Sequence, residues 1–292
     1  MSPIAYPPPE ALLRLLREKE SFLLATHVNP DADGVGSMLG LAGALRKAGK
    51  RVCAVRHEPA PSTFLELPGW EQTQGYDGCA GPFDAVILFD CHEIERIGPA
   101  ARSLQGGETV VVIDHHLTED GGGDGHLEWV EPRAAASAAL VHSLLRTAEG
   151  LDLDAGSATC LYAGLLTDTG GFRFSNTSAA TLAVASDLVA HGADAAHLAE
   201  AFLHRRRPET LRLLSRVLDS FDYRLGGRVV LARMTQAMCE ATGARMEDTE
   251  GFVNFATSAV GVKLVALLME EDSTRWRVSL RANEPYDVQR VA

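Results

Sequence analysis

Cysteine is scarce in this sequence of 292 residues, and its spacing excludes the common uses of clustered cysteines. The five cysteines are Cys53, Cys79, Cys91, Cys160 and Cys239. A zinc finger needs closely spaced pairs, and a disulfide scaffold needs a denser and even set. We therefore expect reduced cysteines and a cytoplasmic protein.

Long apolar runs and a secretory leader are also missing. No run approaches the roughly 20 apolar residues that cross a bilayer. Residues 1–9 are rich in proline and lack a basic region followed by an apolar stretch. Hydrophobic residues still make up 46% of the chain, so a sizeable core can form. We expect no membrane segment and enough chain for two domains.

Basic residues are fewer than acidic residues. The chain has 27 Lys and Arg against 39 Asp and Glu, a formal net charge of −12. A protein that follows long duplex nucleic acid usually presents a basic face. The balance argues against such a partner, and most of the acidic surplus serves solubility. It is compatible with a small anionic substrate held by metal ions and a few arginines.

Three apolar runs end in acidic or imidazole side chains. They cover residues 21–25, 84–89 and 109–113, and such runs are typical of parallel strands buried on both faces. The groups that follow them are His27, Asp31 and Asp33, then Asp90, then Asp114, His115 and His116. Asp168 follows a predicted helix over residues 155–166. Because ligands bind outside the carboxyl ends of parallel strands, we predict that these groups meet at one edge of a sheet.

The order of the predicted elements indicates an α/β fold with two domains. The first is a parallel sheet with flanking helices over residues 1–200. A linker covers 201–222, and a smaller α+β domain covers 223–292. The segment 26–37 is expected to be a loop, with a helix beginning at Met38.

The clustered carboxylates indicate a two-metal site. Four or five carboxylates near one point cannot all be ionised unless cations lie between them. Two divalent ions bridged by one carboxylate, about 3.5–4 Å apart, would lower the pKa of a shared water and clamp a phosphoryl oxygen. Mixed His and Asp ligands suit Mn²⁺, with Mg²⁺ as the alternative. The predicted reaction is hydrolysis of a phosphoester or phosphoanhydride. The simpler alternative, that Asp31 and Asp33 only cap a turn, remains open for the first motif alone.

Four motifs in order carry a family resemblance. They are His27-x-x-x-Asp31-x-Asp33-Gly34, Asp90 at a strand end, Asp114-His115-His116 and Asp168-Thr169-Gly170. Together they resemble the DHH phosphoesterase superfamily, and within it the branch that pairs a DHH with a DHHA1 domain, the nanoRNase/pAp phosphatase (bifunctional oligoribonuclease) type. The resemblance runs from about Ser21 to the end of the chain. It implies an enzyme that trims short RNA or DNA oligonucleotides to mononucleotides and removes the 3′-phosphate of pAp.

The resemblance also implies a role for each motif residue. It places His27 and Asp31 on the first metal ion, and Asp33, His115 and Asp168 on the second, with Asp90 bridging both. It makes Asp114 orient a histidine, and it makes His116 contact the scissile phosphate or assist the leaving group. Arg281 matches the arginine of a DHHA1 domain. Arg173 is a second candidate for substrate contact.

Several alternatives stay open from the sequence. Related DHHA1 domains continue into a glycine-rich G-G-G-H segment, whereas this chain stops at Ala292, so we expect an incomplete second domain. Rival activities are a cyclic- or linear-dinucleotide phosphodiesterase, a RecJ-like single-strand exonuclease and an inorganic pyrophosphatase. A non-catalytic nucleotide-binding protein on the same fold is a further alternative, and a homodimer is one possible assembly. We expect Phe172 and Phe174 in the core rather than stacked on bases, and His92 at the surface or behind the metal ligands.

Overall fold

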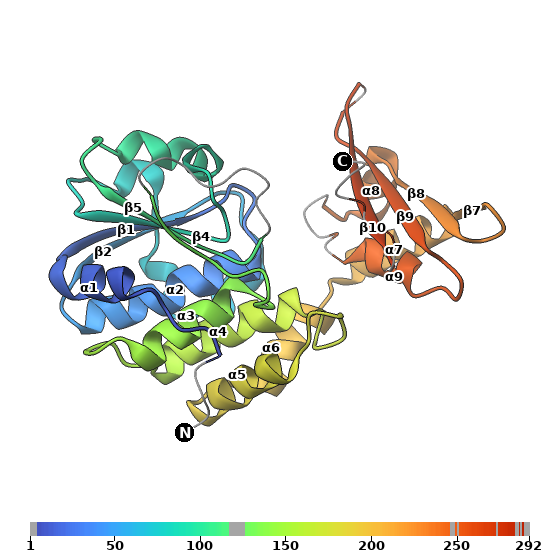
Figure 1. The fold of residues 1–292 in the computed structure, drawn as a ribbon. Helices are drawn as coiled ribbons and strands as arrows, with labels where there is room; N and C mark the ends of the chain where they lie inside the picture. The colour runs from blue at the N-terminus through green and yellow to red at the C-terminus, as the bar shows by residue number, and fades with distance from the viewer. Residues whose placement is uncertain are drawn as a thin grey trace. The chain divides into compact units, whose positions relative to one another are not determined.

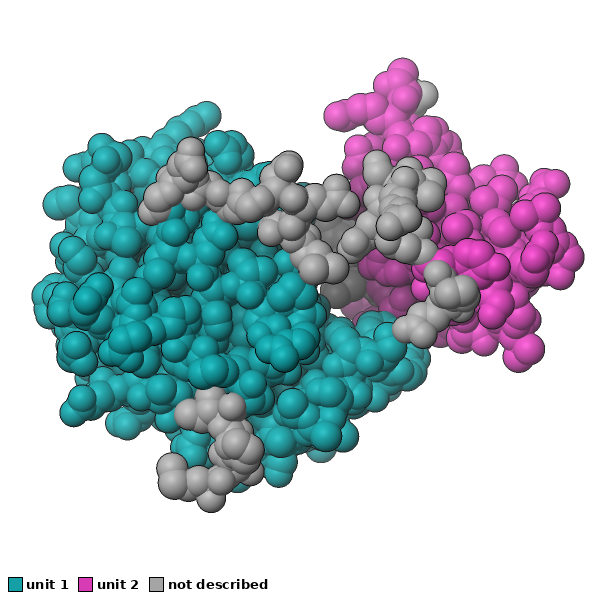
Figure 2. All heavy atoms as spheres, viewed as in Figure 1, with its two compact units in different colours: residues 1–205 teal, residues 206–292 magenta. Residues whose placement is uncertain are grey.

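The chain forms two compact units. The computed structural model describes residues 5–116, 126–245, 249, 251–272, 274–283, 286 and 288. The first unit comprises residues 1–205 and the second residues 206–292, coloured separately in Figure 2. Among the described residues, no helix combines the length and the apolar character that a bilayer crossing requires.

A six-stranded parallel sheet forms the centre of the first unit. Its strands are β1 Ser21–Thr26, β2 Arg51–Arg56, β3 Gln74–Gly75, β4 Ala85–Phe89, β5 Thr109–Asp114 and β6 Leu127–Val130. Their order in the sheet is β3-β2-β1-β4-β5-β6, and every pair is parallel. The three strands with polar ends, β1, β4 and β5, are therefore direct neighbours. This adjacency brings their carboxyl ends to one stretch of the sheet edge.

Both faces of this sheet are buried. Along β1, Phe22 and Leu24 pack into one hydrophobic cluster, whereas Leu23 and Ala25 pack into another on the opposite face. The first cluster includes residues of the long helices that Figure 1 shows against the sheet, and the second includes residues from the 3₁₀ segment η4. The helical elements are α1 Glu10–Glu18, α2 Ala32–Lys47, η1 Ser62–Glu66, η2 Trp70–Gln72, η3 Tyr76–Gly78, η4 Ile94–Ser103, α3 Ser137–Thr147, α4 Ala155–Asp168, α5 Ala179–Ala190, α6 Ala195–Ala199 and η5 Glu200–His204. Burial on both faces explains why the strands are continuous apolar runs.

Helix α2 begins at Ala32, six residues before the predicted start at Met38. Asp31 caps it, because its carboxylate accepts hydrogen bonds from the first-turn amides of Asp33 and Gly34. The glycines that favoured a loop are needed for close packing instead. A side chain at Gly34 would lie 2.1 Å from Thr26 Oγ1. The expectation of a loop up to residue 37 is therefore wrong, and Asp33 lies on the first turn of a helix.

One cysteine pair also differs from the prediction. Cys53 on β2 and Cys79 after η3 form a disulfide across 26 residues of sequence. Cys91, Cys160 and Cys239 are buried and take no part in this disulfide. No spacing pattern indicates this pair, because the pairing depends on how the segment after β3 folds back onto β2.

The second unit has a smaller, mixed sheet. Its elements are α7 Pro208–Asp219, β7 Asp222–Arg224, β8 Val229–Met234, α8 Gln236–Thr242, α9 Phe252–Thr257, β9 Leu264–Glu270 and β10 Trp276–Ala282. The strand order is β10-β9-β8-β7, with only β8 and β9 parallel. Residues of α7, α8 and α9 share one hydrophobic cluster with residues of β8 and β9. Helix α7, which the sequence placed in the linker, thus belongs to the core of the second unit.

Candidate metal centre

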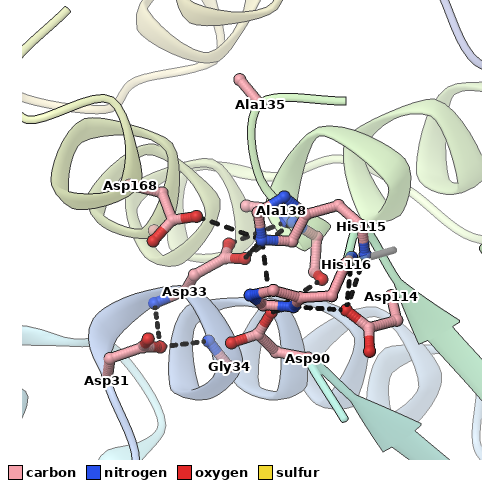
Figure 3. Close-up of polar contacts among 12 residues, drawn as sticks. Asp31, Asp33, Gly34, Asp90, Asp114, His115, His116, Ala135, Ala138 and Asp168 are labelled. Atoms are coloured by element: carbon pink, nitrogen blue, oxygen red, sulfur yellow. Dashed lines mark hydrogen bonds and ion pairs between the residues drawn. The ribbon is translucent and has the colours of Figure 1, made fainter. Parts of the chain in front are cut away.

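The carboxyl ends of β1, β4 and β5 present the predicted polar groups at one place. His27 follows β1, Asp90 follows β4, and Asp114 is the last residue of β5. Helix α2 contributes Asp33 from its first turn, and α4 contributes Asp168 from its last residue. Figure 3 shows these carboxylates pointing toward the two histidines that follow β5. The fold therefore converges five separate chain segments on a single acidic cluster.

The first group of potential metal ligands consists of His27, Asp31 and Asp90. One donor atom from each lies within 4.8 Å of the others. The Nε2 atom of His27 is 3.5 Å from Asp90 Oδ2. Asp31 serves two purposes, because Oδ1 caps helix α2 while its carboxylate also faces this group. The capping alternative and the metal-binding interpretation of Asp31 are thus compatible.

The second group consists of Asp33, His115 and Asp168, again with donor atoms within 4.8 Å of one another. His115 Nε2 lies 3.1 Å from Asp168 Oδ2 and 3.8 Å from Asp33 Oδ2. Asp33 is fully buried, and its two oxygens accept hydrogen bonds from the backbone amides of Ser137 (2.7 Å) and Ala138 (2.9 Å). The N-terminus of α3 therefore fixes the direction of this carboxylate and stabilises its negative charge.

Asp90 occupies the centre of the cluster. Its carboxylate is 3.5 Å from His27, 3.4 Å from His115 and 3.3 Å from His116. The backbone of Asp90 has a φ of +57°, a left-handed conformation that costs about 1–3 kcal/mol for most residues and that Asp tolerates better than most. Such a conformation directly after β4 turns the side chain into the cluster instead of along the strand. Asp90 thus belongs to the first ligand group and contacts His115 of the second; with His115 and His116 it also forms a third set of close donor atoms.

Asp114 holds the second histidine of its motif. Its Oδ1 accepts hydrogen bonds from His116 Nδ1 (2.8 Å) and from the backbone amides of His115 and His116. The other oxygen, Oδ2, has no hydrogen bond and lies 3.5 Å from His92 Nδ1. The His116 side chain is 49% exposed, so one end of its ring is fixed and the other is accessible. Asp114 lies behind His116, where it can orient the ring.

The ionisable groups of the cluster shift one another's pKa values. Burial, then the charges of Asp90 and Asp168, raises the pKa of Asp31 to about 6. Burial, then the charges of Asp168 and Asp90, raises the pKa of Asp33 well above its usual range. Burial would also raise the pKa of Asp90, but the three imidazoles around it lower it.

The histidines shift in the opposite direction. Burial opposes a charge on His115, yet its contacts with Asp168 and Asp90 raise its pKa to about 11. The hydrogen bond to Asp114 raises the pKa of His116 to about 10, with a further contribution from Asp90. Protonated imidazoles therefore supply the positive charge that the carboxylates require when no cation is bound.

The donor set fits two divalent cations. His115 Nε2 is buried and has no hydrogen-bond partner, although carboxylate oxygens surround it at 3.1–3.8 Å. Metal–ligand distances of about 2.0–2.2 Å bring donor atoms to such separations around one ion. The oxygen-rich donors with one imidazole in each group are those that Mn²⁺ and similar ions accept. The residues present can hold the ions that the sequence predicts.

The two aromatic residues after Asp168 have different environments. Phe172 is half-buried and packs against Tyr162, with ring centroids 6.0 Å apart. Phe174 is 41% exposed, so the expectation that it is a core residue is wrong. The Arg173 guanidinium lies 5.6 Å from the centroid of the Phe174 ring.

Arg281 belongs to the second unit. It is exposed on β10, and its Nη1 donates a hydrogen bond to the carbonyl oxygen of Leu280. Its contact with substrate remains a prediction.

Three contributors to the site were not predicted from the sequence. Ser137 and Ala138 act through backbone amides, which any residue could supply, so side-chain patterns do not reveal them. His57 hydrogen-bonds through Nε2 to the carbonyl oxygen of Thr26, next to His27. The cue available for α3 was the run of small residues before it, which permits close approach to Asp33.

Known proteins are similar to this chain in sequence and in fold. Residues 21–165 match the family described as "DHH family, N-terminal domain". The bifunctional oligoribonuclease and PAP phosphatase NrnA of Thermus thermophilus is 34% identical over 269 residues, covering 92% of this chain and 78% of that protein. The protein of the same name from Bacillus subtilis is 27% identical, covering 94% and 85%. An exopolyphosphatase-related protein of Bacteroides fragilis has the same fold, with a TM-score of 0.88 at 24% identity, covering 97% of this chain and 85% of that one.

Proposed function

Because the chain belongs to the DHH family, we propose that it is a two-metal-dependent phosphoesterase. Its proposed substrates are short oligonucleotides, which it cleaves to mononucleotides, and pAp, from which it removes the 3′-phosphate. The observation that carries the proposal is the pair of ligand groups that meet at Asp90. The relatives from Thermus thermophilus and Bacillus subtilis, named for both activities, support the choice of substrates.

The metal ligands divide into two sets in this proposal. His27 and Asp31 would hold one cation, Asp33, His115 and Asp168 would hold the other, and Asp90 would serve both. The mixed carboxylate and imidazole donors favour Mn²⁺, with Mg²⁺ as the alternative. When bound, two divalent cations supply the positive charge that attracts phosphoryl oxygens and activates water for attack.

The remaining residues of the site orient the other side chains or supply a proton to the substrate. Asp114 accepts the Nδ1 hydrogen of His116, so Nε2 is the ring nitrogen directed away from it. Because the pKa of His116 is raised, both ring nitrogens are protonated at neutral pH, and Nε2 therefore carries a proton as well as Nδ1. That proton can be donated in a hydrogen bond to the phosphate, or transferred to the departing oxygen. The backbone amides of Ser137 and Ala138 hold the Asp33 carboxylate in a fixed direction for metal binding.

A substrate panel tests the proposal. The purified protein is incubated with Mn²⁺ and, separately, a 5′-phosphorylated diadenylate, pAp, a cyclic dinucleotide, pyrophosphate and a long RNA duplex. We expect the diadenylate to give AMP and pAp to give AMP and phosphate, with the other three slower by at least about tenfold. Turnover of neither the diadenylate nor pAp, with metal bound, would contradict the proposal. Fastest turnover of the cyclic dinucleotide or pyrophosphate would replace its substrate assignment.

A further inference from the structure

We propose that Phe174 is a stacking platform for a nucleobase of the substrate, with Arg173 as its cationic neighbour. The inference rests on the proposed function and deepens it, because it assigns base recognition to the loop that follows Asp168. It predicts preference for phosphoesters that carry a base, and for purines over pyrimidines because purines offer a larger stacking face.

The loop ties Phe174 to the end of α4, where Asp168 lies. Asp168 ends α4, and the chain then turns back on itself within six residues. The amides of Arg173 and Phe174 both donate to the carbonyl oxygen of Thr169, at 2.9 and 3.0 Å. These bonds keep Phe174 within one turn of a proposed metal ligand.

The loop is also anchored to the rest of the site. The side-chain amide of Asn176 donates to the carbonyl oxygens of Asp168 and Ala135, both at 3.1 Å. Ala135 lies in the segment that leads to the α3 amides holding Asp33. The ring of Phe174 is therefore presented by a backbone that is tied to both sides of the second ligand group.

The hydrophobic clusters do not account for the position of Phe174. Phe172, two residues earlier, packs against the main hydrophobic cluster of the first unit, whereas Phe174 belongs to no cluster among the described residues. Gly170 adopts a φ of +57°, and a Cβ there would lie 2.4–2.7 Å from three carbons of the Phe174 ring. The backbone at Gly170 thus makes room for an aromatic ring that remains 41% exposed.

The chemistry of the cluster requires a separate base-recognition element. Its carboxylates, imidazoles and cations interact with phosphoryl oxygens, which are the same in every nucleotide. An exposed ring beside a guanidinium provides stacking and cation–π attraction, and both act on any base. Stacking on one aromatic side chain strengthens binding by about tenfold or more.

Steady-state kinetics on matched substrates tests the inference. We compare wild type with Phe174→Ala and Phe174→Trp on the 5′-phosphorylated diadenylate, the diuridylate and a dinucleotide analogue without bases. Phe174→Ala should raise KM for the diadenylate about tenfold with kcat within about twofold of wild type. It should leave kcat/KM for the base-free analogue unchanged and reduce the preference for adenine over uracil. Phe174→Trp should retain the wild-type KM.

A control variant distinguishes the loss of a contact with the base from a general disturbance of the fold. Leu182→Ala removes an apolar side chain that is 51% exposed on α5 and should leave all three substrates unaffected. Equal loss on base-bearing and base-free substrates in Phe174→Ala would show a structural role and overturn the inference. An unchanged KM for the diadenylate would also overturn it.

A binding measurement gives the answer without turnover. A dinucleotide containing 2-aminopurine loses fluorescence when its base stacks on an aromatic ring. Wild type should quench it and Phe174→Ala should not, at protein concentrations that saturate both. Equal quenching by both proteins would contradict stacking, whether or not the proposed hydrolysis occurs.

Discussion

The sheets of the two units differ in strand direction and in burial. As a result, polar side chains occupy different positions in the two units. The first sheet is parallel and buried on both faces, so polar groups are confined to its edges and strand ends. The second is mixed, and along β8 the buried Val230 and Ala232 alternate with the exposed Leu231 and Arg233.

The acidic and imidazole groups of the first unit meet outside neighbouring strands, in groups of three whose ligand atoms lie within 4.8 Å of one another. In the described part of the second unit, no set of His, Cys, Asp and Glu comes equally close. A parallel sheet thus concentrates chemistry at one point, whereas the second unit offers separate surface residues such as Arg281. We expect substitutions in the two ligand groups of the first unit to change turnover, and substitution of Arg281 in the second unit to change binding.

The largest effect is expected from Asp90→Asn. The amide keeps the size of the side chain but removes the charge that both ligand groups share. Turnover of the diadenylate should fall by at least about 10²–10³-fold, since the Asp90 carboxylate contacts a histidine of each ligand group and its charge is needed to hold both cations. Rates with saturating Mn²⁺ and metal content by mass spectrometry provide the measurement.

A matched substitution controls for the loss of a paired aspartate. Asp187→Asn removes a carboxylate of the first unit that pairs with His142 and Arg146 on α3. It should lower the melting temperature more than the turnover. If Asp90→Asn retained wild-type turnover, the assignment of the bridging ligand would be wrong.

How far the sequence predicts this site depends on the kind of signal. The polar ends of β1, β4 and β5 were predictable, because buried parallel strands are continuous apolar runs and their carboxyl ends meet at one edge. The start of α2 was not, since Gly34 resembles a loop residue until Thr26 is seen packed against it. The backbone amides that hold Asp33 have no sequence signature.

Side chains of one type can also have opposite environments. Phe172 and Phe174 are the same residue two positions apart, yet one is half-buried and the other exposed. Their difference depends on the turn at Gly170, where φ is positive. Cys53 and Cys79 illustrate the same limit, because long-range folding brings them together and local spacing does not.

The next largest effect is the pH dependence of metal binding. In the metal-free protein the raised pKa of His115, about 11, keeps its ring protonated at neutral pH. A cation must displace that proton, so the affinity for Mn²⁺ should rise about tenfold per pH unit between pH 6.5 and 8.5. Calorimetry in two buffers of different ionisation enthalpy measures the released proton. His115→Gln should bind more weakly and lose most of this slope, and an unchanged slope would exclude His115 as a ligand.

The same histidine sets the stability of the metal-free protein. Its pKa is raised on folding, so its contribution is fully present below about pH 6.5, the unfolded value, and is lost as the pH rises toward 11. Thermal melts of metal-free protein should therefore show decreasing stability from pH 7 to 10. Bound Mn²⁺ should reduce this decrease, because the cation replaces the proton as the partner of Asp90 and Asp168.

The smallest effect is expected in the second unit, from Arg281→Ala. Its guanidinium is exposed on β10, and among the described residues no carboxylate pairs with it. It can therefore bind a substrate phosphate, and its loss should raise KM for the diadenylate about tenfold with little change in kcat. Arg277→Ala, on the same strand and the same side of the sheet, is the matched control, because Arg277 already lies near Glu271 and Met269. A large fall in kcat for Arg281→Ala would show that the second unit takes part in the chemistry and would remove the division between the units.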